Sequence, residues 1–357
     1  MDRRTFLKTT TAAAAVTTAT GVAHAGVNAG TDIAAPAIVT SRQELRIGVP
    51  SEPRLKDAAQ LFAREIEAAS GGRIVMHLTD ASGPALTALE GRTIDGAFGH
   101  LPELCAAPEL SLFTGLPGDL AFSPENLMTW LNAGAGSMFL EEAAATFDLA
   151  ALTAGHSGAG TGLWANRPLN GLDDIANAQI DTLGLGRGLL NSIQSASPSS
   201  SSITPHVRLV EAAAQPMQAY AELPDAVRQN WYRDGLHRQG FATSLVLSLA
   251  AWHNLSAGDQ LLLQTFALAA THHDLAAAST NSRLVTPAVM ESLPVDVRTL
   301  PPIIETTIQQ ASTQLVRDAM AANETMDRAF QAYSSFFEAM TGKPLDGPEK
   351  FASRALS

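Results

Sequence analysis

The sequence predicts an α/β protein made of two lobes. A strand, a helix and a second strand follow one another at 45–49, 54–69 and 73–78, and such a β-α-β opening favours a parallel sheet with helices on its faces. About 330 residues remain after an N-terminal leader, which is more than one compact core usually holds. Apolar residues recur at helical spacing over 304–340, which predicts a long helix near the C-terminus.

Residues 1–25 show the order of features that an exported precursor has. The pair Arg3-Arg4 precedes an uncharged Ala/Thr/Val stretch over 9–22, which is too short and too weakly apolar to span a bilayer. Ala23-His24-Ala25 then gives the small-x-small pattern of a signal-peptidase site. We therefore expect a twin-arginine signal peptide and export from the cytoplasm, followed by a Gly/Ala/Thr-rich linker at 26–44.

Charge and cysteine content exclude several classes of partner and site. Without residues 1–25 the chain has 20 Lys and Arg against 34 Asp and Glu, so nucleic acid is not an expected partner. No later segment has the length and hydropathy of a membrane span. The single cysteine, Cys105, excludes an internal disulfide and a multi-cysteine metal site, and it is expected to pack as a small apolar residue.

Helices and strands continue to alternate along the chain. Turn residues follow Phe113, and the segment from there to Leu149 could lie at the edge of a cleft. The remaining expected elements are a helix at 85–90, a strand at 93–100, helical spacing over 127–147, strands at 163–167 and 180–183, a helix at 172–175, a helix after the glycine turn 184–188, a serine-rich loop at 195–202 and a helix over 241–271.

The strand at 163–167 is expected to cross into the second lobe. Lobe I then takes 45–162 and 236–285, lobe II takes 163–235 and 286–303, and the long helix takes 304–345. The long helix could pack within one subunit or exchange with a second copy in a homodimer, and its periodicity does not choose between these arrangements.

Several segments, in this order along the chain, resemble a known family. They are 93–99, 112–118, 125–147 with Trp130, 155–164, 172–175, 232–240 and 252–255. Together they resemble the extracytoplasmic solute-binding subunits of tripartite ATP-independent periplasmic (TRAP) transporters, particularly those that bind oxo acids and related carboxylates. The resemblance covers most of 45–345 and rests on collinear order, since no single segment is a sharp motif.

The resemblance implies a periplasmic protein of two α/β lobes joined by a hinge and a long helix. The lobes would close over a small organic solute and pass it to the membrane permease subunits of a TRAP transporter. Such a protein carries out no covalent chemistry, so the chain is not expected to be an enzyme. A degenerate family member that binds a partner or acts as a sensor, without transport, is the alternative.

The family's ligand contacts are not all present. The arginine that holds the ligand carboxylate in the family falls at Asp181 here, and a carboxylate cannot hold a carboxylate without a proton or a metal between them. The family's glutamine falls at Gly160, and its acidic segment before Trp231 has only a loose counterpart at 210–214. The ligand class is therefore open: a neutral or cationic molecule, a metal-bridged acid, or none.

Other residues could replace these contacts. Arg187 lies in a glycine turn that enters a helix, where backbone N–H groups and a guanidinium could bind an anion, the alternative being a solvated arginine. Trp231 and Arg233 offer a stacking face and a cation, and Trp164 is a similar aromatic candidate. Phe113 is also a candidate, although ordinary packing explains it more readily. With Asp181, these residues form the predicted ligand site.

No metal site or catalytic constellation is expected. His272 and His273 are adjacent on a helix, so their side chains point about 100° apart and do not converge on one ion. No cofactor is expected, and a calcium or sodium ion between Asp181 and an anionic ligand stays an open alternative. The segment 155–158 lacks the Gly-x-Ser-x-Gly pattern of a hydrolase elbow, and no phosphate loop or other nucleophile arrangement is recognisable.

Overall fold

The computed structural model describes residues 42–81, 85–176, 178–196, 207–233, 235–285, 290–321, 323–342 and 344–345, within a unit that spans 41–357. The predicted signal peptide at 1–25 lies outside these residues, as do most of the predicted linker and most of the serine-rich loop. The predicted signal peptide and export route are therefore not tested by the structure and stay predictions.

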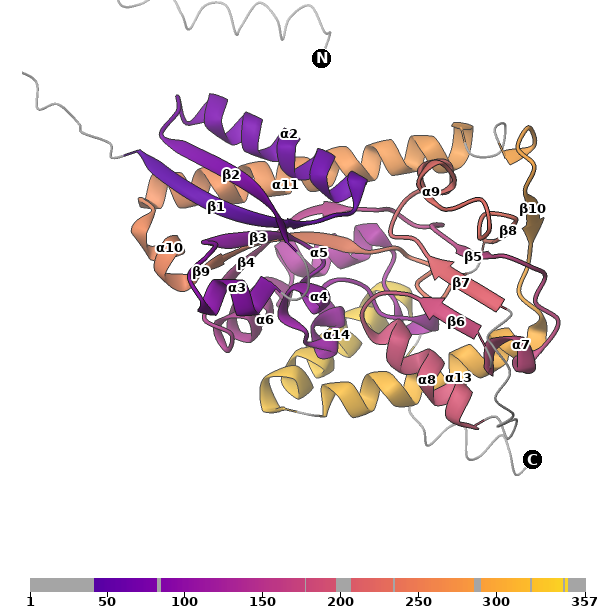
Figure 1. Ribbon diagram of the computed structural model, residues 1–357. Helices are drawn as coiled ribbons and strands as arrows, with labels where there is room; N and C mark the ends of the chain where they lie inside the picture. Colours follow the sequence, from indigo (N-terminus) through magenta and orange to yellow (C-terminus); the bar gives the residue numbers. More distant parts are fainter. Residues whose placement is uncertain are drawn as a thin grey trace, which may run out of the picture. The chain divides into compact units, whose positions relative to one another are not determined.

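The first sheet has five strands in the order β2-β1-β3-β9-β4 (Figure 1). β1 pairs in parallel with β2 and β3, whereas β9 runs antiparallel to β3 and β4. The β-α-β opening and its parallel pairing are as predicted. The strands are β1 (Gln43–Pro50), β2 (Ile74–Ala81), β3 (Gly96–Gly99), β4 (Leu149–His156) and β9 (Ala242–Ser248).

Helices cover both faces of this sheet. α2 (Pro53–Ala69) and α11 (Ala257–Thr280) bury Leu55, Ile66 and Leu263 against one face. On the other face lie the shorter helices that come before and after β3. These are α3 (Ala85–Glu90), α4 (Leu101–Cys105), the 3-10 turns Pro108–Phe113 and Gly118–Leu120, α5 (Pro124–Ala133) and α6 (Gly136–Ala145). α10 (Leu249–Asn254) follows β9 and packs through Ala251 and Trp252 with the core beneath α2 and α11.

The second sheet has the order β10-β8-β5-β7-β6, with β5 antiparallel to both of its neighbours. α8 packs on one face beside the C-terminal helices, and α9 lies on the other, where Trp164 and Trp231 are buried. Its elements are β5 (Leu163–Ala165), α7 (Leu172–Ala176), β6 (Ala178–Asp181), α8 (Leu185–Ala196), β7 (Val207–Glu211), α9 (Pro216–Glu222), β8 (Asn230–Tyr232) and β10 (Asp296–Arg298).

Three connections join the two sheets: β4 to β5, β8 to β9, and α11 through the π-helical turn Asn281–Val285 to β10. The first two lie against each other, because Ser157 N–H donates to the Phe241 carbonyl and Gly160 N–H to the Arg238 carbonyl. Gly240 sits at this crossing with φ +77°, and a Cβ there would lie 2.0 Å from the Gly158 carbonyl oxygen. The strands of each sheet fall within one predicted lobe, and the lobe boundaries themselves stay a prediction.

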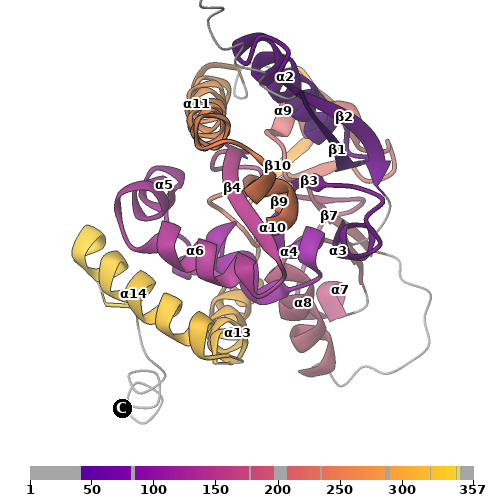
Figure 2. The same ribbon diagram turned by 90° about the vertical axis from the view of Figure 1, so that its left-hand side faces the viewer.

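A long C-terminal helix is present, and a second helix follows it where the sequence predicted a continuation to 345. α13 (Pro302–Met320) ends before Asn323, whose side chain accepts the Met326 N–H at 2.8 Å and starts α14 (Glu324–Thr341). Figure 2 shows α14 beside α6. The apolar periodicity continues across the break because both helices bury one face, so periodicity alone did not reveal the cap.

The predicted helix over 241–271 is wrong in its first part, because 242–248 form the strand β9. Nearly every residue of β9 is buried on both faces of the sheet, so its apolar run lacks the alternation that identifies a strand. No helix in the described ranges combines the length and the apolar character needed to cross a membrane.

Candidate ligand-binding site

Strand ends of the two sheets meet at one place in the molecule. Arg54 follows β1 and His100 follows β3, at the carboxyl ends of parallel strands of the first sheet. Glu211 ends β7 of the second sheet. The Gly184 N–H donates to the Glu103 carboxylate at 2.5 Å, which ties the start of α8 to α4 across the junction. Ligands of α/β proteins bind at such carboxyl ends.

Arg54 is the second residue of α2 and lies at this junction. Its side chain is only 12% exposed, and its nearest carboxylate is that of Glu52, 3.8 Å from Nε. Nε and Nη2 are both buried and have no hydrogen-bond partner in the described part of the chain. A buried guanidinium without partners is costly, and its planar fork fits a carboxylate. The arrangement is suited to an anionic ligand.

Two buried histidines lie near the Arg54 charge. Burial, reinforced by that charge, lowers the pKa of His100 and of His156 to about 3, so both rings are neutral. Nδ1 of His100 donates to the Ala242 carbonyl at 3.0 Å, which leaves Nε2 as an unpartnered acceptor. Nδ1 of His156 accepts the Gly158 N–H at 2.9 Å. The fixed positive charge at this point therefore rests on Arg54.

A buried acid holds the second sheet to the β8–β9 connection. Glu211 accepts the His237 N–H at 2.6 Å, the His237 Nδ1–H at 2.8 Å and the Thr182 hydroxyl at 2.7 Å. Burial alone would raise the pKa of Glu211, but the His237 ring and these hydrogen bonds lower it. The Phe241 ring lies tilted against both histidine rings, with ring centroids 4.6 Å from His237 and 5.7 Å from His100. The network fixes one wall of the site.

Acidic side chains surround the same junction. Burial raises the pKa of Glu103 and of Glu52, and the neighbouring carboxylates Glu222 and Asp181 add to the effect at Glu52. Oε2 of Glu103 is buried and has no hydrogen-bond partner among the residues that the structure describes. An anionic ligand would therefore be drawn specifically to the Arg54 fork rather than to the junction as a whole.

The structure places Asp181 and Arg187 together, close enough to the junction for their charges to act on Glu52 and Glu103. Both are exposed and line a cavity of about 430 Å³. The glycine turn enters α8 as predicted, with Gly184 at φ +53°. Its backbone donors are already used, because Glu103 accepts the Gly184 N–H and the Ser111 hydroxyl accepts the Leu185 N–H. The backbone N–H of Gly184 therefore already binds an anion, the Glu103 carboxylate, and is not available to an anionic ligand.

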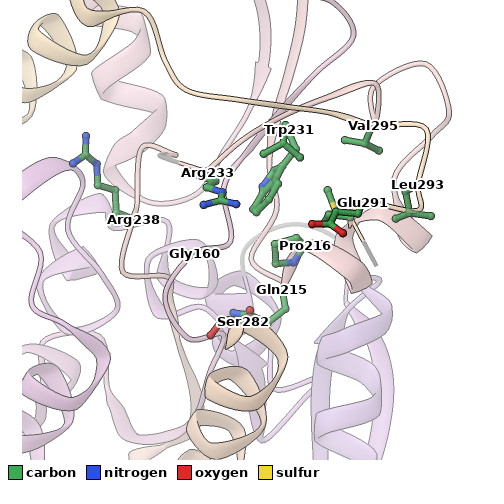
Figure 3. Close-up of a pocket in the computed structure, with 12 residues that line it drawn as sticks. Gly160, Gln215, Pro216, Trp231, Arg233, Arg238, Ser282, Glu291, Leu293 and Val295 are labelled. Carbon is green, nitrogen blue, oxygen red and sulfur yellow. The ribbon is translucent and has the colours of Figure 1, made fainter. Parts of the chain in front are cut away.

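The aromatic candidates fall in two other places. Trp164 is fully buried and stacks on Trp231 with ring centroids 6.1 Å apart. Trp231 and Arg233 line a cavity of about 670 Å³ (Figure 3). Phe113 is buried and stacks on Trp130 at 5.7 Å, in the core of the first sheet. The six predicted residues are therefore not brought together into one site.

Sequence reasoning missed Arg54, His100 and His237. A signal for Arg54 exists in Ser51-Glu52-Pro53-Arg54, where a proline starts a helix directly after the first strand. His272 and His273 are exposed, in keeping with divergent side chains. Within the described ranges no group of three or more His, Cys, Asp or Glu is arranged to hold a metal ion.

Solved structures are similar to most of this chain, although no protein-family model and no curated protein sequence matches it. A TRAP periplasmic solute-binding protein from Pseudoalteromonas atlantica, with bound sodium and pyruvate, has a TM-score of 0.69 at 16% identity, covering 88% of this chain and 98% of that one. A second, from Bordetella bronchiseptica, is a dimer of mixed occupancy with calcium and picolinate; its TM-score is 0.71 at 14% identity, covering 88% and 96%.

A third similar structure, a TRAP periplasmic solute-binding protein from Chromohalobacter salexigens, contains (S)-2-amino-1-propanol. Its TM-score is 0.68 at 13% identity, covering 84% of this chain and 96% of that one. Identities this low show the fold alone. The predicted α/β fold class, with two lobes and a long C-terminal helix, is confirmed, and the fold is the one these structures share.

Proposed function

We propose that this chain is a periplasmic solute-binding protein that captures a small organic carboxylate for a TRAP-type transporter. The observation that carries the proposal is the buried, unpartnered fork of Arg54 between the two sheets. Asp181 occupies the position of the usual arginine, and Arg54 offers a replacement cation from the opposite sheet. The fold shared with TRAP solute-binding proteins supports the transport role.

Closure around the ligand would be the mechanism. Arg54 and His100 belong to the first sheet, whereas Glu211 belongs to the second and is bonded to His237 in the connection between them. A ligand that contacts groups from both sheets stabilises the closed arrangement. Its measured affinity therefore includes the free energy of closure as well as that of the direct contacts. No bond of the ligand is made or broken in this cycle, and the proposal includes no enzymatic step.

An ion is not required by the proposal, since Arg54 supplies the positive charge. Two of the similar structures hold sodium or calcium together with their ligands, so binding is to be measured with and without calcium. The proposal includes export by the twin-arginine route, membrane permease subunits as partners, and the lobe boundaries predicted above. Replacing Arg3-Arg4 by two lysines would retain the protein in the cytoplasm if that route is used.

Calorimetric titration of the purified protein with oxo acids, hydroxy acids and dicarboxylates tests the proposal. At least one should bind, and at a hundred times its dissociation constant it should stabilise the fold by about 2.7 kcal/mol. Arg54→Lys keeps the charge but loses the fork and should weaken binding about tenfold, and Arg54→Gln about a hundredfold. Arg64→Gln, at an exposed position of the same helix α2, is the matched control and should leave binding unchanged.

Undiminished binding by Arg54→Gln would refute the assignment of the site. If no carboxylate, amine or neutral solute binds, the alternative of a degenerate family member that binds a partner or acts as a sensor becomes the better account. Stable association with a second copy, measured by light scattering, would separately test the homodimer.

A further inference from the structure

The cavity that Trp231 and Arg233 line is bounded by all three connections between the sheets. Its volume is about 670 Å³. Gly160 comes from the β4–β5 connection, Arg233 from the β8–β9 connection, and Ser282 and Met290 from the α11–β10 connection. Arg54, His100, His156 and His237 do not line it. It therefore shares no lining residue with the site proposed around Arg54, and it contains Trp231 and Arg233 of the ligand residues predicted from the sequence.

Its walls combine an aromatic face with apolar side chains. Trp231 is 4% exposed and Met290 5% exposed, so both are held firmly in the cavity wall. Leu293 and Val295 extend the apolar surface on the side of the α11–β10 connection (Figure 3). The volume and the walls suit a ligand with a bulky apolar part.

Charges of opposite sign are also present in the wall. The Arg233 guanidinium lies 5.9 Å from the centre of the Trp231 ring. Figure 3 shows Arg233 to one side of Trp231 and the Glu291 carboxylate to the other. Neither Arg233 nor Glu291 forms an ion pair with another residue that the structure describes. Within the described residues, both charges are therefore available to pair with a ligand.

Gln215 adds a fixed acceptor. Its side-chain amide N–H groups donate to the carbonyl oxygens of Ser157 at 2.7 Å and Ala159 at 3.2 Å, which holds the amide against the β4–β5 connection. The residue is 6% exposed, and its Oε1 has no partner in the described ranges. A buried acceptor left open in a cavity wall favours a ligand that carries a donor.

We propose that this cavity is a second binding site, for a zwitterion with a bulky apolar side chain, such as a free aromatic or branched aliphatic amino acid. The ligand carboxylate would pair with Arg233, and its ammonium group with Glu291 and the open acceptor of Gln215. The apolar side chain would lie against Trp231 and Met290.

A ligand here would act on closure. The cavity is built from the segments that must move when the sheets part, so its occupant stabilises the conformation in which Arg54 is buried. Binding at the two sites would then be positively coupled, each ligand tightening the other by the same factor. This coupling rests on the proposed function, whereas binding of the amino acid alone does not.

Titration of the purified protein with L-phenylalanine, followed by calorimetry, tests the second site. 3-Phenylpropionate lacks the ammonium group and phenethylamine lacks the carboxylate, so each should bind at least tenfold more weakly than phenylalanine. Arg233→Gln and Glu291→Gln should each weaken phenylalanine binding at least tenfold. Arg187→Gln, in the separate cavity beside Asp181, is the control and should have no effect.

Arg54→Gln distinguishes the two sites. It should weaken capture of the carboxylate about a hundredfold and leave phenylalanine binding intact. The second site is refuted if phenylalanine does not bind at millimolar concentration, if the two truncated analogues bind as well as phenylalanine, or if Arg54→Gln or a bound carboxylate prevents phenylalanine from binding. Failure of every carboxylate to bind at Arg54 would overturn the proposed function. Phenylalanine binding would still test the second site in that case.

Discussion

The imidazole of His237 and the carboxylate of Glu211 form a hydrogen-bonded pair, 2.8 Å apart, with both side chains fully shielded from solvent. The pair joins the end of β7 to the connection that leads back to the first sheet. It therefore links the second sheet to a segment that must adjust whenever the sheets move.

Removing the acid of this pair should destabilise the fold strongly. Glu211→Gln leaves the buried His237 ring and the Thr182 hydroxyl facing a neutral amide, and we expect a loss of about 3–5 kcal/mol in the free energy of unfolding. Lys56→Gln removes the exposed ion pair with Asp80 and should cost no more than about 1 kcal/mol. Urea denaturation measures both. Equal losses in the free energy of unfolding would show that burial of the His237–Glu211 pair does not make it more important to stability than the exposed pair.

Acidification should destabilise the protein through its buried histidines. The pKa of His100 and of His156 is about 3 in the folded chain against 6.5 for an ordinary histidine, so between these values the unfolded chain binds more protons. Stability is therefore present above pH 6.5 and falls as the pH falls. From pH 6.5 to 5 each ring accounts for about 1.6 kcal/mol, because the unfolded ring is already half protonated at pH 6.5.

The variant His156→Asn tests this, because the asparagine carbonyl can still accept the Gly158 N–H. Its free energy of unfolding should vary less steeply with pH than that of the parent, by about 1 kcal/mol per pH unit on average between 5 and 6.5. His253→Asn, at an exposed position, should keep the parent slope. Identical slopes for His156→Asn and the parent would show that His156 is not a buried neutral ring.

The close crossing at Gly240 predicts a graded response to alanine. Gly240→Ala would place a Cβ 2.0 Å from the Gly158 carbonyl oxygen in a left-handed conformation, so a loss of more than about 3 kcal/mol is expected. Gly160→Ala meets the same strain at φ +83° with no atom within 4 Å and should cost about 1–2 kcal/mol. Thermal denaturation compares them, and a larger loss at Gly160 would contradict the packing described.

A substitution at Phe113 tests whether this residue packs in the core or contacts the ligand. Its ring is 2% exposed and stacks on Trp130, so Phe113→Ala should cost about 3–5 kcal/mol in stability. The dissociation constant of a carboxylate bound at Arg54 should remain within about twofold of the parent value. A large loss of affinity in a variant that is still folded would restore Phe113 as a ligand contact.

Much of the fold was readable from the sequence, because local patterns are enough to define an element with one buried face. The helix predicted at 85–90 has those limits in the structure, and the one predicted at 54–69 begins one residue earlier. β9 was not recognised, since a central strand buried on both faces shows no alternation.

The site was less predictable, because it is assembled from strand ends that are distant in sequence. The family alignment pointed to Asp181 and its neighbours, whereas the buried cation comes from the start of α2 in the other sheet. Spacing along the chain cannot show that His100 and His237 approach the same aromatic ring. Only the pairing of the strands brings them together.

α13 contributes to two hydrophobic cores. Ile304 and Ile308, near its start, pack with the second sheet, and Val316 and Met320, near its end, pack with the helices that cover the first. In the proposed cycle, separation of the two sheets would expose to water the apolar contacts of one half of this helix. Exposure of apolar surface raises the heat capacity, so release of a captured solute should raise the heat capacity of the protein. The release rate should also increase steeply with temperature.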